Sequence, residues 1–157
     1  MKRTSMIRKY LFFLFLLGLN VTSVHAAEGD TVGRIKTVSG PVNVMRGSDN
    51  LAAKPGMKLV SSDTLITGKD GSTGVVFSDN STLSLGPNTK FQISRYEFNV
   101  LEKKAGFVGR ISRGTMVYLS GLIARMNADA TRFETPVAVA GVRGTKLAIK
   151  VDGDDNE

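Results

Sequence analysis

The segment VVFSDNSTLSL at residues 75–85 predicts a β-hairpin and, with it, the class of fold. Residues 75–77 form a β-rich run, and Leu83 and Leu85 alternate with polar residues, so the two leucines share one face of a strand. Between the runs lies a turn at residues 79–81, in which Asn80 supplies the residue type that, after glycine, best tolerates positive φ. We therefore expect two antiparallel strands joined by a tight turn.

The same pattern of apolar runs and turns recurs on both sides of this hairpin. Further β-rich or alternating runs lie at residues 42–44, 91–93, 111–119 and 146–151, and turn residues separate them about every 8–12 positions, the rhythm of an all-β protein. Residues 119–126 come closest to a helical stripe, but they contain Gly121 and are interpreted as strand. The prediction is an all-β fold of short strands and hairpins in a single domain over residues 31–151.

Two arrangements of these strands fit the pattern. A glycine followed by an apolar strand recurs at residues 33–35 and 109–111, which suits stacked hairpins or solenoid rungs. Regularly spaced turns also suit a pair of packed sheets. The sequence thus predicts either a β-solenoid-like or a sandwich-like domain.

The first 26 residues have the three parts of a secretory signal peptide. Basic residues at positions 2, 3, 8 and 9 precede the apolar run LFFLFLL at 11–17, and small residues follow at 24–26. The apolar run from 11 to 19 is shorter than the roughly 20 residues of a spanning helix. We expect cleavage after Ala26, a periplasmic or secreted location, and no membrane span in the mature chain.

The charge balance gives no sign of a nucleic-acid partner. The full chain has 21 basic and 14 acidic residues, but four of the basic ones lie in the leader, which leaves 17 against 14. The remaining basic residues are spread singly, apart from Lys103-Lys104, whereas nucleic-acid binding needs a clustered patch. We expect no nucleic-acid binding.

The residue inventory also argues against catalysis. The single histidine, His25, lies in the leader, and the chain has no cysteine. Imidazole general bases, Ser-His and Cys-His pairs and conventional zinc sites are therefore absent from the mature sequence. We predict a non-enzyme without cofactor or metal.

The end of the chain allows two interpretations. DGDDNE at 152–157 does not match the spacing of a calcium-binding loop, and is interpreted as an acidic tail or a truncated end. In the first case the final strand is an exposed sheet edge protected by Lys146, Lys150 and the acidic tail.

Two blocks of sequence resemble the FecR family. The first, at residues 56–89, has the pattern D-x-[IL]-x-T followed by L-x-L-x-x-N-T, and the second, at 135–147, resembles T-P-x-A-x-x-x-V-R-G-T-x-F. The likeness extends from about residue 33 to 151 and is strongest over 56–150. The motif positions are interpreted as mainly structural, since turn glycines and asparagines serve backbone geometry. They are Asp63, Thr67, Asp79, Ser81, Asn88, Thr135, Pro136, Arg143, Gly144 and Thr145. Arg143-Gly144 in particular is expected to form a turn or bulge before the last strand.

The resemblance implies a β-rich extracytoplasmic module. Founding members of the family are membrane-spanning regulators that receive a signal from an outer-membrane transporter and pass it to a sigma factor. With a cleavable leader in place of the cytoplasmic region, this chain resembles a stand-alone periplasmic member. We expect a protein-interaction or signal-sensing module whose partner is an unidentified envelope protein, with edge-strand pairing as the expected mode of binding.

The alternative function is a glycan-binding or structural protein of the cell envelope. Tyr96, Phe98 and Tyr118 would then be the aromatic side chains that stack on sugars. Aromatic residues make up only 7% of the chain and tryptophan is absent, so core packing is the preferred interpretation of these three.

Export gives the first testable prediction. Mass spectrometry of the envelope fraction should find a mature N-terminus at Ala27 or within a residue or two of it, because the small residues at 24–26 form the cleavage site. Full-length protein retained in the inner membrane would contradict the cleaved-signal interpretation.

Overall fold

A computed structural model describes residues 30–143 and 145–153. The predicted leader, Gly144 and residues 154–157 of the predicted tail lie outside the described residues. The strands are β1 (Thr31–Ser39), β2 (Val42–Arg46), β3 (Asp49–Ala52), β4 (Lys58–Val60), β5 (Thr64–Thr67), β6 (Ser72–Phe77), β7 (Thr82–Leu85), β8 (Lys90–Asn99), β9 (Lys104–Leu119), β10 (Thr131–Glu134), β11 (Val139–Gly141) and β12 (Lys146–Val151). One short helix, α2 (Leu122–Met126), follows β9.

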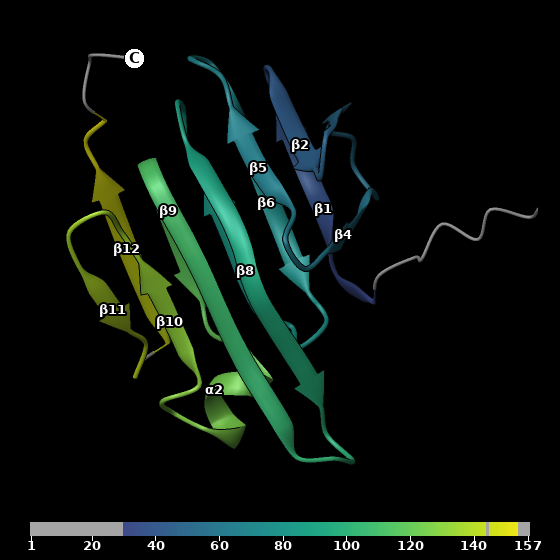
Figure 1. Cartoon of the computed structure of the whole chain (residues 1–157), viewed down its shortest axis with the longest axis vertical. Coiled ribbons are helices and arrows are strands. Elements are labelled where there is room, and N and C mark those ends of the chain that lie inside the picture. Colours follow the sequence, from purple (N-terminus) through teal and green to yellow (C-terminus); the bar gives the residue numbers. More distant parts are fainter. Residues whose placement is uncertain (1–29, 144, 154–157) are drawn as a thin grey trace, which may run out of the picture.

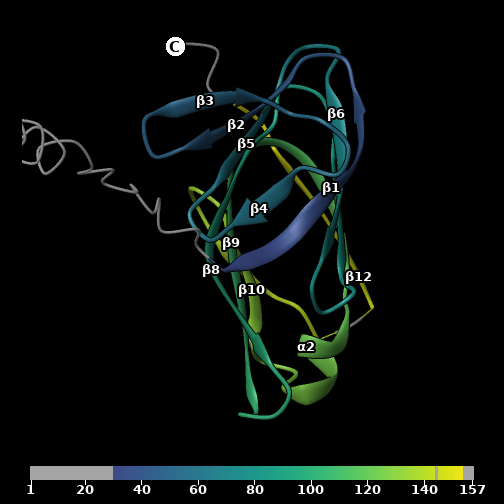
Figure 2. The same cartoon turned by 90° about the vertical axis from the view of Figure 1, so that its right-hand side faces the viewer.

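These strands form one continuous sheet that curls over itself into a half-barrel (Figures 1 and 2). We call its two sides wall A and wall B. Wall A contains β4, β1, β6, β7, the second part of β9, and β12. Wall B contains β3, β2, β5, β8, the first part of β9, β10 and β11. Every pairing is antiparallel except that of β9 with β10, which is parallel.

Strand β9 belongs to both walls. Residues 104–113 pair with β8, and residues 107–110 pair with β10 on the other side. From Gly114 the strand pairs with β12, and from Met116 also with β7. The change of wall falls at Gly114, whose φ of +96° is a conformation that side-chain-bearing residues rarely adopt.

The core lies between the walls and is rich in aromatic rings. Phe107 is at its centre, with ring centroids 4.8 Å from Phe77 and 5.4 Å from Phe133. Tyr96 and Tyr118 complete the contacts around it, at 5.5 and 5.7 Å. All five rings are buried, and edge-to-face packing of this kind adds about 0.5–1.5 kcal/mol per pair beyond the area buried.

The structure confirms the all-β, single-domain prediction, including the hairpin that decides it. β6 and β7 pair antiparallel around the turn at residues 79–81, and Asn80 has φ +63°. Leu83 and Leu85 both face the core. Of the two arrangements expected, the curled sheet is nearer to a sandwich, because its walls face each other across one core and its strands do not stack as parallel rungs.

The strand predicted over residues 119–126 is wrong in its second half. β9 ends at Leu119, and residues 122–126 form helix α2. Its first free amide groups donate to Asp79: Leu122 N–H to the backbone oxygen at 2.8 Å, and Ile123 N–H to Oδ2 at 3.2 Å. The helix start is therefore stabilised by a residue more than forty positions earlier, which no local pattern reveals.

A pair of glycines tests the bend in β9. A Cβ on Gly114 would overlap the backbone and side chain of Thr89, with Thr89 Cβ only 2.7 Å away, whereas Gly47, also at positive φ (+58°), has nothing within 4 Å. We expect Gly114→Ala to lower the free energy of unfolding by more than about 3 kcal/mol and Gly47→Ala by about 1 kcal/mol. Urea denaturation of both variants measures the difference. Equal losses would show that the crowding at Gly114 is relieved without cost.

Candidate functional site

The first motif residue, Asp63, fixes the turn between β4 and β5. Its side chain is fully buried and forms a two-pronged ion pair with Arg46 of β2, with Nε–Oδ1 and NH2–Oδ2 distances of 2.8 Å. Oδ2 also accepts the Val60 amide at 2.9 Å. The hydrogen bonds to Asp63 raise the pKa of Arg46. Asp63 thus ties the β4–β5 turn to β2 through a fully buried carboxylate.

Thr67 and Asn88 stabilise the turn between β7 and β8. Thr67 Oγ1 donates to the Gly86 oxygen at 2.6 Å and accepts the Thr89 amide at 2.8 Å. Asn88 has φ +52°, and its amide donates to the Gly68 oxygen at 3.0 Å. These hydrogen bonds join the β7–β8 turn to residues 67–68 at one end of the half-barrel.

Asp79 and Ser81 form a third buried network. Asp79 Oδ1 accepts the Ser81 hydroxyl at 2.6 Å, the Ser81 amide at 3.1 Å and the Tyr96 hydroxyl at 3.0 Å. With the Ile123 amide on Oδ2, the fully buried carboxylate has four donors. Burial, and next the negative charge of Asp79, raises the pKa of Tyr96. This network ties the β6–β7 turn to β8 and α2.

The remaining motif residues lie near the surface, away from these networks. Thr135 Oγ1 accepts the Ala138 amide at 2.9 Å in the β10–β11 turn, beside the exposed Pro136. Arg143 pairs with Asp129 at 3.2 Å, and both side chains are more than three-quarters exposed. Thr145 is exposed and its backbone oxygen accepts the Ser120 amide. The expected turn at Gly144 falls outside the described residues. The motif positions therefore do not converge on one site.

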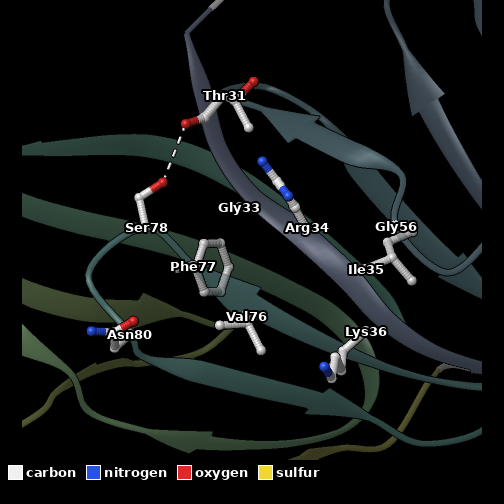
Figure 3. Close-up of a pocket in the computed structure, with 10 residues that line it drawn as sticks. All are labelled: Thr31, Gly33, Arg34, Ile35, Lys36, Gly56, Val76, Phe77, Ser78 and Asn80. Carbon is white, nitrogen blue, oxygen red and sulfur yellow. Dashed lines mark hydrogen bonds between the residues drawn. The ribbon is translucent and has the colours of Figure 1, made fainter.

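A groove of about 730 Å³ runs along β1 and β6 (Figure 3). Arg34 and Lys36 lie on its rim as exposed side chains, and Val76 contributes apolar surface. The Ser78 hydroxyl at one end already donates to the oxygens of Thr31 and Val32, at 3.3 and 3.1 Å. The groove thus offers two solvated cations but no buried polar group directed at a ligand.

A second groove lies beside the final strand. It measures about 440 Å³ and lies between β7, β9 and β12, where Ser84, Val117 and Ala148 form its floor and Lys150 its rim. The registers place Ser84, Val117 and Ala148 in one row across the three strands. This mainly apolar groove adjoins β12, which among the described strands pairs with β9 alone.

The outward face of wall A has charges of one sign. Arg34, Lys36 and Lys58 alternate with buried residues on β1 and β4, and Lys146 and Lys150 are exposed on β12. The wall A strands contain no aspartate or glutamate. Wall B, in contrast, mixes its charges in pairs such as Arg95–Glu97 and Arg110–Glu134. Sequence reasoning had noted the lysines of β12 but could not know that β1 and β4 share their face.

The three aromatic residues considered for sugar stacking belong to the core. Tyr96 and Tyr118 are buried, and Phe98 packs against the core from a partly buried position. The rings of Tyr96 and Tyr118 contact other aromatic rings, as in the preferred interpretation, so neither offers a free platform to a glycan.

Comparison with known proteins identifies the family. The model described as "FecR protein" matches residues 63–157, which is more than half of the chain, and the chain therefore belongs to the FecR family. Membership indicates an extracytoplasmic signalling or surface module. A solved structure titled "Cell surface anchoring domain" is 25% identical over 40% of this chain and 83% of its own, with a TM-score of 0.38. No curated protein matches. Within the described residues, none of the helical structure has the length and apolar character to cross a membrane.

The buried carboxylate of Asp79 gives a prediction about the motif. Asp79→Ala removes the acceptor of four donors, and we expect the free energy of unfolding to fall by about 3 kcal/mol or more. The matched control is Asp70→Ala, an exposed turn residue, which should change it by no more than about 0.5 kcal/mol. Thermal melts followed by circular dichroism compare the two. A stable Asp79→Ala protein would show that the network does not hold the fold.

Proposed function

We propose that this domain is an extracytoplasmic protein-interaction module, and that it recognises an envelope protein by adding the partner's strand to the edge of β12 that no described strand pairs with. The observation that carries the proposal is the hydrogen-bonding phase of β12, that is, which of its residues direct their backbone groups toward β9 and which direct them outward. A periplasmic or secreted location and a signal-sensing role belong to the same proposal, because founding family members receive their signal outside the cytoplasm.

The phase follows from one hydrogen bond and the register. The Ser120 amide donates to the Thr145 oxygen at 3.0 Å, and the register then pairs Leu147 with Tyr118 and Ile149 with Met116. In an antiparallel ladder, hydrogen-bonded pairs alternate with pairs whose backbone groups point away. Residues 145, 147, 149 and 151 therefore bond to β9. Lys146, Ala148 and Lys150 direct their amide and carbonyl groups outward.

An outward row of three residues is a template for a further strand. Unpaired amide and carbonyl groups at a sheet edge bind extended peptides through main-chain hydrogen bonds, while neighbouring pockets select side chains. The groove beside Ala148 supplies such a pocket. The groove along β1 and β6 lacks a comparable row, which is why we favour the β12 edge.

The alternative, a glycan-binding role, has less support. The aromatic residues named for it are in the core, and the β12 edge offers backbone groups and lysines in place of flat aromatic faces. We therefore retain protein binding as the proposed function.

A proline pair tests the proposal. Ala148→Pro removes an amide that points outward, so the ladder to β9 remains complete while an incoming strand loses a donor and meets the proline ring. The measurement is affinity capture from the envelope fraction of the source cells. Wild type should retain the partner protein, and Ala148→Pro should retain at least about tenfold less of it. Thermal melts should show a near-native fold for this variant.

Ile149→Pro is the matched control, because it breaks the bond to Met116 and should destabilise the domain itself. The proposal is contradicted if folded Ala148→Pro captures the same proteins in the same amounts as wild type.

A further inference from the structure

We infer that the strand accepted by β12 is acidic at two positions four residues apart, with apolar residues between them. The inference rests on the proposed function and specifies the chemistry of the partner. It follows from the side chains that flank the outward row, on each face of the sheet in turn.

On the outward face, two lysines frame the row. Lys146 and Lys150 are exposed and point to the same side as Ala148. At about 3.3 Å per residue their Cα atoms are about 13 Å apart along the strand. A paired strand places its own residues opposite them at the same spacing, whether it runs parallel or antiparallel. Carboxylates at these two positions would form cross-strand ion pairs, which stabilise sheets, whereas like charges destabilise them.

The charged side chains on the strands around the edge have the same positive sign as these lysines. The other charged residues on the wall A strands, Arg34, Lys36 and Lys58, are basic too. A face of one sign attracts a partner of the opposite sign during the encounter. Within the described residues, Asp152 is the acidic residue that follows this edge; it pairs with Lys150 at 2.8 Å, but both side chains are more than two-thirds exposed. Such a pair exchanges partners at little cost.

Between the lysines the edge prefers an apolar side chain. Ala148 is small, and with Val117 and Ser84 it forms the floor of the 440 Å³ groove. A residue opposite Ala148 can cover this groove. On the inward face, Leu147, Ile149 and Val151 pack against the core but remain partly exposed. The two partner residues that point inward would bury this apolar surface.

A second copy of this chain fits the edge poorly. Both strands of such a dimer would have to pair through their outward residues, and the full antiparallel overlap sets Ala148 opposite Ala148. Lys146 of each copy then lies opposite Lys150 of the other, which gives two like-charge pairs. Natural edge strands use lysines in this way against self-association. The charge pattern therefore selects an acidic partner strand over a self-pairing one.

The test uses three synthetic seven-residue peptides with the full mature domain, beginning at Ala27. The acidic peptide is Thr-Glu-Val-Ala-Val-Glu-Thr, and the two controls replace both Glu by Gln or by Lys. Fluorescence anisotropy with a labelled peptide measures affinity. We expect the acidic peptide to bind roughly 3- to 30-fold more tightly than the Gln peptide, as two exposed cross-strand ion pairs would provide. The difference should shrink as salt is raised from about 0.05 to about 0.5 M.

A charge-reversed domain supplies the decisive comparison. Lys146→Glu with Lys150→Glu should prefer the Lys peptide over the acidic one, and Ala148→Pro should weaken all three peptides together. Equal binding of the three peptides, lost in Ala148→Pro, would overturn the acidic partner and leave edge pairing intact. Binding of the acidic peptide that Ala148→Pro does not reduce would overturn the proposed edge function itself. Absence of binding by any peptide at millimolar concentration also overturns the inference.

Discussion

The fold depends on one strand being shared by two walls. β9 pairs on both sides over half of its length, with β8 and β10 at residues 107–110 and with β7 and β12 at residues 116–119. Such a strand has to change direction without losing its ladder. Gly114 permits this at φ +96°, and Gly109 lets Phe91 and Phe133 approach its backbone so closely that a Cβ there would lie 2.8 Å from Phe133. The aromatic rings can pack against β9 because Gly109 has no side chain, and the strand can cross from wall B to wall A because Gly114 permits the bend.

The family motif serves this frame. Thr67 and Asp79 gather backbone amides or hydroxyls from segments distant in sequence. Asp63 binds the distant Arg46 guanidinium and the nearby Val60 amide. In a chain without cysteine, buried hydrogen-bond networks of this kind can fix turns that small secreted domains often fix with disulfides. A motif that maintains the frame leaves recognition to residues outside the motif. In our proposal recognition takes place on wall A, whose outward charges have one sign, whereas the charges of wall B are mixed.

Local pattern was sufficient for the strands and insufficient for what connects them. The alternation in residues 83–85 and 146–151 predicts buried and exposed positions correctly, because it depends only on the period of a strand. The Asn80 turn is equally local. The start of α2 depends on Asp79, and the carboxylate of Asp63 depends on Arg46 of another strand, so neither follows from neighbouring residues. The one-signed face of wall A was hidden for the same reason: the basic residues of β1 and β4 precede those of β12 by 88 to 116 positions in the sequence and share a face only through strand order.

The two buried tyrosines couple ionisation to unfolding on the alkaline side. Burial raises the pKa of both Tyr96 and Tyr118 above the ordinary value, which for tyrosine is about 10. The folded state therefore holds its phenol protons more strongly than the unfolded chain. This part of the stability is present in full below about pH 10 and declines as the pH rises further, because unfolding then releases protons. Since both tyrosine rings contact Phe107, the alkaline loss of stability falls on the aromatic cluster that joins the two walls.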